Sequence, residues 1–180
     1  MPSRARVLSS KILYRGRLLQ VKLDRIIEPG NITAEREVVA HRGSVVILPI
    51  LPEGRILLVR QFRYPAGQPL WELVAGTIEP GESVIRAAHR ELLEETGYRA
   101  SSMKAIFSFY PSPGFLAERM HLVEARGLTL SKAHPENDER IEARQFSMSQ
   151  VKRLLLAKKL KDGKTLVGLL WRLFAGNAEG

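Results

Sequence analysis

The feature that most constrains this chain is a run of good helix formers over residues 82–96 that carries four glutamates. A Pro-Gly pair precedes the run, a glycine follows it, and it contains neither residue itself. These signals predict a helix that begins and ends at those positions. On a helical wheel of roughly 100° per residue with Val84 at zero, Glu91 falls near about 340° and Glu95 near about 20°. Two carboxylates are therefore expected on the stripe that faces the core.

Glu94 lies close to these two residues, so that like charges are repeated at spacings of three and four. Such a cluster destabilises a helix, and crowded or buried carboxylates are costly unless a cation or strong donors compensate them. Oxygen-only ligands of this kind suit Mg²⁺ or Mn²⁺. The cluster of Glu91, Glu94 and Glu95 thus predicts a divalent metal site. In the alternative interpretation, Glu94 and Glu95 continue an exposed face and pair with Arg90 and Arg99.

Segments with the composition of β-strands lie on both sides of this helix. Residues 18–27 and 34–41 alternate apolar and polar side chains around a turn at 28–31, which predicts a hairpin. Residues 45–51 and 55–62 are rich in β-branched and large apolar side chains and predict two more paired strands. We expect further strands over 105–109, 120–125 and 142–146 and helices over 149–160 and 165–174, the last apolar nearly all round and buried. This order predicts an α+β or mixed α/β layering.

The composition suits one domain, or one domain plus an arm, since 44% of the 180 residues are hydrophobic. The longest apolar runs are far shorter than the roughly 20 residues that a membrane span requires. The N-terminus is basic without the apolar core of a secretory signal, and the chain has no cysteine. We expect a cytoplasmic protein without a membrane partner.

The net charge of +9 and the pI of about 10.2 indicate anionic partners. Basic residues gather near both ends of the chain, where such runs are usually solvated surfaces. Nucleic-acid binding would be better supported by aromatic side chains interleaved with the basic ones, and aromatics make up only 7% of the chain. We therefore expect no nucleic-acid partner.

The helix and its flanks resemble the catalytic box of the Nudix hydrolases. The pattern is Gly, five residues, Glu, seven residues, Arg-Glu-aliphatic-any-Glu-Glu-any-Gly-aliphatic. The chain matches it with Gly76, Glu82, Arg90, Glu91, Leu92, Glu94, Glu95 and Gly97, and Tyr98 replaces the last aliphatic residue. The resemblance implies an α/β/α sandwich around a mixed β-sheet with an N-terminal β-hairpin arm. We expect the arm over residues 1–42 and the hydrolase domain over 43–180.

The same resemblance assigns roles to individual residues of the box. It implies that Glu91 and Glu95 are the principal ligands of Mg²⁺ or Mn²⁺, assisted by Glu94 and the carbonyl of Ala75. Arg90 would orient the carboxylates. Glu82 would brace the preceding loop.

Residues that flank the box resemble the ADP-ribose pyrophosphatase branch of the family. There, the arginine equivalent to Arg63 contacts phosphate, and Gly76 and Glu79 belong to the substrate pocket. Pro113 stands sixteen residues past the glycine that ends the box, a distance associated with ADP-ribose specificity. Glu118 falls where the branch has an acidic residue. The alternative for Arg63 is an ordinary charge at a strand edge.

Residues 135–142 form an acidic, polar stretch that resembles the branch's catalytic loop. Its glutamate, best matched by Glu139, would act as general base or position the attacking water. On composition alone the stretch is equally a solvated loop. The reaction implied is the Mg²⁺-dependent hydrolysis of ADP-ribose to AMP and ribose 5-phosphate.

The resemblance also implies a homodimer in which the N-terminal strands reach across the partner, with Arg36 contributing to substrate binding. One alternative is a pyrophosphatase of GDP-mannose or another nucleoside diphosphate sugar. A second is a non-catalytic sensor that binds ADP-ribose and represses transcription. About thirty residues follow position 146, too few for an added DNA-binding domain, and the intact box argues against lost catalysis.

Overall fold

The computed structural model describes residues 4–17, 19–131 and 141–175. By its internal packing the chain divides into two units, unit 1 with residues 1–43 and 109–119 and unit 2 with residues 44–108 and 120–180. Within the described ranges, no helix is long and apolar enough to cross a membrane. The catalytic box lies entirely in unit 2.

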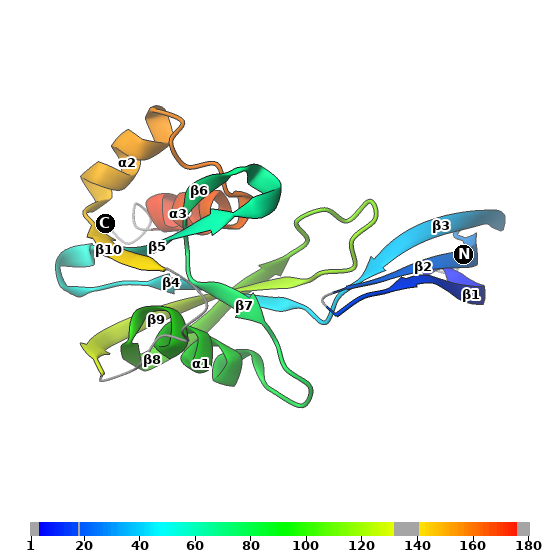
Figure 1. Cartoon of the computed structure of the whole chain (residues 1–180), viewed down its shortest axis with the longest axis horizontal. Coiled ribbons are helices and arrows are strands. Elements are labelled where there is room, and N and C mark those ends of the chain that lie inside the picture. The colour runs from blue at the N-terminus through cyan, green and yellow to red at the C-terminus, as the bar shows by residue number, and fades with distance from the viewer. Residues whose placement is uncertain (1–3, 18, 132–140, 176–180) are drawn as a thin grey trace. The chain divides into compact units, whose positions relative to one another are not determined.

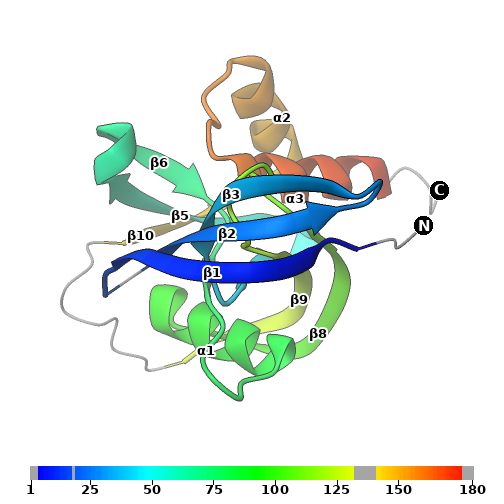
Figure 2. The same cartoon turned by 90° about the vertical axis from the view of Figure 1, so that its right-hand side faces the viewer.

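Unit 1 is built on an antiparallel sheet of three strands, β1 (Arg6–Arg15), β2 (Gln20–Glu28) and β3 (Ile32–Ala40), which lie side by side in Figure 2. The predicted hairpin is β2–β3, and its turn places Gly30 and Asn31 at φ values of 91° and 62°. Strand β1 was not predicted, because its basic residues conceal the strand pattern. The segment 109–119 joins β3 through the backbone hydrogen bond from Val39 N to Phe115 O at 2.8 Å.

The larger sheet of unit 2 has the order β7 (Ala75–Thr77), β4 (Ser44–Pro49), β9 (Met120–Leu130) and β8 (Tyr98–Phe109). Strand β4 runs parallel to β9 and antiparallel to β7, so the sheet is mixed, as predicted. All six residues of β4 are buried, which explains the unbroken apolar run in the sequence.

A second sheet in unit 2 has the order β10 (Glu142–Phe146), β5 (Ile56–Arg63) and β6 (Gln68–Glu72). Our prediction that residues 45–51 and 55–62 form paired strands is therefore wrong, because β4 and β5 belong to different sheets. A single bridge between Ile50 and Ile56 is the contact between their ends. Strand β4 has β7 and β9 on its two edges, and the chain turns away from it through a 3₁₀ turn at Pro52–Gly54.

Helices α1 (Val84–Thr96) and α3 (Gly163–Ala175) cover opposite faces of the larger sheet, and α2 (Met148–Leu156) precedes α3 (Figure 1). Successive residues of β9 point to opposite faces: Val123 packs in the core cluster that contains Ala87 of α1, and Leu122 lies beneath α3. A Cβ added to Gly168 of α3 would stand 3.2 Å from Leu122 Cδ1 and 2.4 Å from Leu73 Cδ1. These layers match the predicted α/β/α sandwich.

Helix α3 is not buried all round, contrary to our prediction. Thr165, Gly168 and Leu169 are its buried residues, whereas Leu170 and Phe174 are 42% and 72% exposed. As an outer layer, the helix contacts the sheet along one stripe, and its remaining apolar side chains stay at the surface.

Candidate functional site

Local interactions fix both ends of helix α1, and the terminal glycine was predicted from the sequence. The Ser83 side chain accepts a hydrogen bond from the backbone N–H of Arg86 at 3.3 Å, which caps the first turn. Gly97 adopts a left-handed conformation at φ 73°, and its N–H bonds to Leu93 O at 2.8 Å. The helix starts two residues later than predicted, because Glu82 belongs to the preceding loop.

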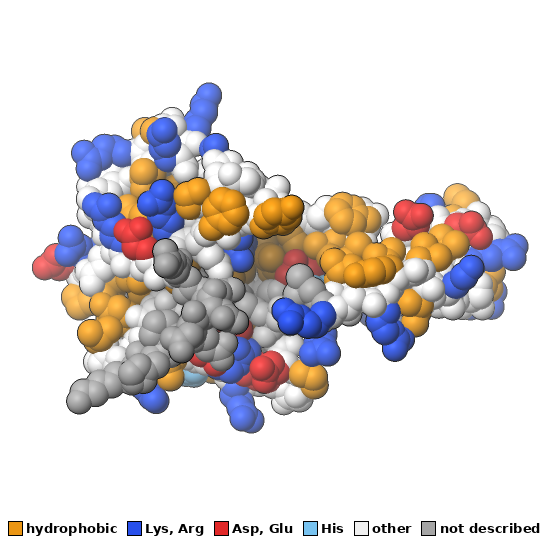
Figure 3. All heavy atoms as spheres, viewed as in Figure 1, with side chains coloured by type: hydrophobic (Ala, Val, Ile, Leu, Met, Phe, Trp, Pro, Cys, Tyr) orange, Lys and Arg blue, Asp and Glu red, His pale blue; other side chains and the backbone are white. Residues whose placement is uncertain are grey.

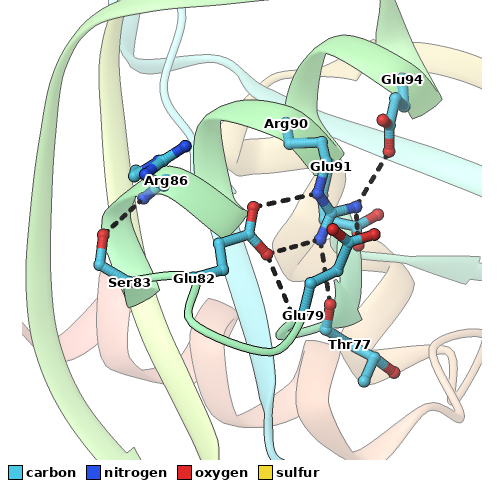
Figure 4. A network of polar contacts seen from close by, with 8 residues as sticks. All are labelled: Thr77, Glu79, Glu82, Ser83, Arg86, Arg90, Glu91 and Glu94. Carbon is cyan, nitrogen blue, oxygen red and sulfur yellow. Dashed lines mark hydrogen bonds and ion pairs between the residues drawn. The ribbon is translucent and has the colours of Figure 1, made fainter.

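Arg90 is the centre of a polar network on this helix (Figure 4). Its guanidinium donates to both oxygens of Glu82, at 3.1 and 2.9 Å, and to the carbonyl of Thr77 at 3.0 Å. Nη1 donates to Glu91 Oε1 at 2.7 Å and to Glu94 Oε2 at 3.1 Å. The planar fork thus serves three carboxylates at once, and the hydrogen bond to Glu82 raises the pKa of Arg90 far above its ordinary range.

Glu82 connects this network to the loop before the helix. Its Oε2 accepts the backbone N–H of Glu79 at 3.1 Å in addition to the guanidinium. The hydrogen bond from Arg90 holds the pKa of Glu82 below its ordinary value. Glu79 is thereby placed at the same loop as the box, with its side chain exposed.

The Glu91 carboxylate lies against the backbone of strand β7. A Cβ added to Gly76 would stand 2.0 Å from Glu91 Cδ and Oε1, so only glycine leaves room for it. The side chain of Glu91 is 12% exposed, and burial raises its pKa in spite of the hydrogen bond from Arg90. Among the described residues, its Oε2 accepts no hydrogen bond. A partly desolvated carboxylate beside the backbone of Ala75 and Gly76 has the chemistry that a hard divalent cation requires.

The remaining predicted ligands are Glu94 and Glu95. Glu94 is 43% exposed and turned toward Arg90, and Glu95 follows Glu91 by one helical turn and is partly buried. Within the part of the chain that the structure describes, no three His, Cys, Asp or Glu side chains converge on a common metal position. In Figure 4 the guanidinium of Arg90 contacts the carboxylates of both Glu91 and Glu94.

Arg63, at the end of β5, forms a two-pronged ion pair with Glu72 of β6. Its Nε and Nη2 each donate to one carboxylate oxygen at 2.8 Å. Glu72 is 1% exposed, and Lys164 of α3 also reaches its Oε2, at 2.5 Å. Burial alone would raise the pKa of Glu72, but the hydrogen bonds and charges of Arg63 and Lys164 bring it below its ordinary value.

Asp162 extends this network to the start of α3. Its Oδ2 lies 3.0 Å from Lys164 Nζ and accepts from both the N–H and the hydroxyl of Thr165. The Thr165 oxygen in turn accepts the backbone N–H of Leu73 at 2.8 Å. Sequence reasoning missed Glu72, Asp162 and Lys164. Two signals were present: a lone acid inside an apolar strand, and an Asp three residues before Thr in the pattern of a helix cap.

Two predicted substrate residues belong to unit 1. Arg36 donates to Glu28 Oε1 through Nε at 3.0 Å and Nη2 at 2.7 Å. Glu118 Oε1 lies 3.6 Å from Nδ1 of His41. A pocket of about 420 Å³ in this unit has Arg36 and Pro113 among its lining residues. Glu139 lies outside the described residues.

The comparisons with known proteins agree with this geometry. The NUDIX domain model matches residues 40–167. An ADP-ribose pyrophosphatase of Bacillus subtilis (strain 168) is 32% identical over 89% of this chain and 88% of its own. A methanol dehydrogenase activator of Bacillus methanolicus is also 32% identical, over 91% of this chain and 90% of its own.

A solved structure described as an ADP compounds hydrolase shares the fold. It aligns with a TM-score of 0.85 at 22% identity and covers 99% of this chain and 97% of that chain. With the box, the layers and the family match in agreement, this chain belongs to the Nudix family.

Proposed function

We propose that this protein hydrolyses the diphosphate of ADP-ribose, with AMP and ribose 5-phosphate as products and Mg²⁺ as the metal. The observation that carries the proposal is the partly buried Glu91 carboxylate against Gly76, inside a complete Nudix box. The similarity to an ADP-ribose pyrophosphatase over most of both chains supports this substrate.

The metal ligands in this proposal are Glu91 and Glu95, with Glu94 and the carbonyl of Ala75 completing the set. A bound divalent ion neutralises diphosphate charge and lowers the pKa of coordinated water. Arg90 holds the Glu91 carboxylate in place through Nη1, and its bond to Glu82 ties the helix to the loop. The protein's own part is to orient these acids.

Within unit 2, Arg63 is proposed to bind a phosphate oxygen, and Gly76 and Glu79 are proposed as further substrate residues. Within unit 1, Arg36 and Glu118 are proposed to contact substrate, each on the strength of its position in the sequence. Glu139 is proposed as the general base on the strength of the sequence alone.

The exposed apolar surface of unit 1 supports the proposal of a homodimer. All ten residues of β1 are exposed, among them Val7, Ile12 and Tyr14 at 56%, 46% and 58%. Hydrophobic side chains gather over this sheet in Figure 3. A three-stranded sheet with uncovered apolar side chains gains stability from a second layer, and a second copy of the arm offers one.

Product analysis tests the substrate. Purified protein with Mg²⁺ is incubated with ADP-ribose, GDP-mannose and other nucleoside diphosphate sugars, and AMP or GMP release is followed by chromatography. We expect ADP-ribose to be hydrolysed with the highest kcat/KM and Glu95→Gln to lose activity while remaining folded. Preferred hydrolysis of GDP-mannose would contradict the substrate. Absence of hydrolysis of any substrate, with ligand binding equal in wild type and Glu95→Gln, would instead favour a sensor.

A further inference from the structure

The buried carboxylate of Glu72 is contacted by two cationic side chains, although one would be enough to neutralise it. Glu72 is 1% exposed and already receives both prongs of Arg63, yet Lys164, itself 11% exposed, approaches the same Oε2. Burying a third charge is costly unless it serves the other two. The contacts form a row of alternating charges, Arg63, Glu72, Lys164 and Asp162.

This row influences how much positive charge Arg63 presents. Paired with Glu72 alone, the guanidinium would be neutralised and would attract an anion weakly. Lys164 shares the Glu72 carboxylate, so it offsets part of that negative charge. Asp162 contacts Lys164 and acts in the opposite direction.

The network is also attached to the metal loop by a short stretch of backbone. Glu72, at the end of β6, and Gly76, in β7, are separated by about 13 Å of extended chain. The stretch between them is fixed at Leu73 N by the Thr165 hydroxyl and at Val74 O by Ile47 N, both at 2.8 Å. The start of α3 therefore fixes the position of one segment, which has Glu72 at one end and Gly76 at the other.

We propose that Lys164 is a positioning residue for substrate: through Glu72 it fixes the Arg63 guanidinium and keeps its charge available to the diphosphate. This inference rests on the proposed function, in which Arg63 binds that diphosphate. In this proposal Lys164 acts through Glu72 and not by contact with substrate. Asp162 tunes the same charge with opposite sign.

The test uses the KM for ADP-ribose in the full-length protein with Mg²⁺. Lys164→Met is expected to raise KM about tenfold, the effect of losing one hydrogen bond to a charged group, and to leave kcat within about threefold. Asp162→Asn keeps the cap of α3, since Asn caps as well as Asp, but removes the negative charge. It is expected to lower KM or leave it unchanged.

Lys161→Met is the matched control. Lys161 is an exposed lysine beside the same helix start, and its Nζ donates to the neutral Gln68 side chain at 3.1 Å rather than to Glu72. Its removal subtracts the same net charge and is expected to leave KM unchanged. In the Glu72→Gln background, Lys164→Met is expected to lose most of its effect, because the charge through which it acts is gone.

The outcomes separate this inference from the proposed function. Wild-type protein that releases no AMP from ADP-ribose overturns the proposed function. An active wild type whose KM is unchanged by Lys164→Met, or raised equally by Lys164→Met and Asp162→Asn, overturns the positioning role. If Lys164→Met melts below the assay temperature, the KM of Asp162→Asn provides the test. A KM higher than that of wild type refutes the inference.

Discussion

Replacing Gly76 by alanine tests the packing that defines the proposed metal site. The new Cβ would stand 2.0 Å from Glu91 Cδ and Oε1, whereas ordinary contact begins near 3.4 Å, so the carboxylate has to retreat by about 1.4 Å. It cannot do so freely, because Arg90 Nη1 holds Oε1 at 2.7 Å. A misplacement of about 1 Å in a catalytic group costs on the order of 100-fold in rate. We expect kcat of Gly76→Ala to fall at least about 100-fold, or about 2.7 kcal/mol of transition-state stabilisation.

The assay follows AMP release at saturating ADP-ribose over a Mg²⁺ titration, with the melting temperature measured on the same samples. Gly163→Ala is the matched control, since a Cβ there meets nothing within 4 Å and its backbone is not in the left-handed region. We expect this control to retain full activity and to gain up to about 1 kcal/mol of stability. A folded Gly76→Ala protein with kcat within threefold of wild type would refute the reasoning. It would mean that the Glu91 position against β7 has no bearing on catalysis.

Three further outcomes are expected. Arg90→Lys should lower kcat at least about tenfold and the free energy of unfolding by about 2 kcal/mol, because an ammonium cannot bridge Glu82 and Glu91 as the planar guanidinium does. AMP release measures the first quantity and urea unfolding the second. Burial raises the pKa of Glu91, so its ionised carboxylate opposes folding at neutral pH without metal. The melting temperature should therefore rise with Mg²⁺ in wild type and not in Glu91→Gln. In EDTA, the melting temperature of Glu91→Gln should be no lower than that of wild type. The pKa of Glu72 lies below its ordinary 4.5, so its contribution to stability is complete above pH 4.5 and is lost as the pH falls through the lower folded value; the urea midpoint of Glu72→Gln should lack this acid dependence.

The parts of the fold that were predicted from the sequence depend on local signals. Helix α1 was predicted because a Pro-Gly pair lies shortly before its first residue and a glycine directly follows its last. The hairpin β2–β3 followed from alternation and a glycine turn for the same reason. The wheel also placed Glu91 on the inward stripe, and its side chain is 12% exposed.

The parts that were not predicted depend on contacts between distant segments. No local signal shows that β4 and β5, which a short connection over residues 50–55 joins, belong to different sheets, because the choice of sheet depends on β7 and β9. The pairing of Glu72 with Lys164 crosses 92 residues of chain. An isolated acid in an apolar strand signals that a cation is needed, but the sequence does not say which of 28 Lys and Arg residues supplies it.

The structure also changes the reason for expecting a metal. From the sequence, the repulsion between clustered glutamates required a cation, but Arg90 already meets Glu82, Glu91 and Glu94. Arg90 alone does not balance the negative charge of these three carboxylates, because a guanidinium carries a single positive charge. Glu95 lies one helical turn after Glu91. A diphosphate brought to such a surface by Arg63 would be repelled by the box unless divalent cations lay between them. In the proposed function the two networks would therefore have different roles: Arg63, held by the Glu72 row, would bind the diphosphate, and the carboxylates of the box would bind the metal.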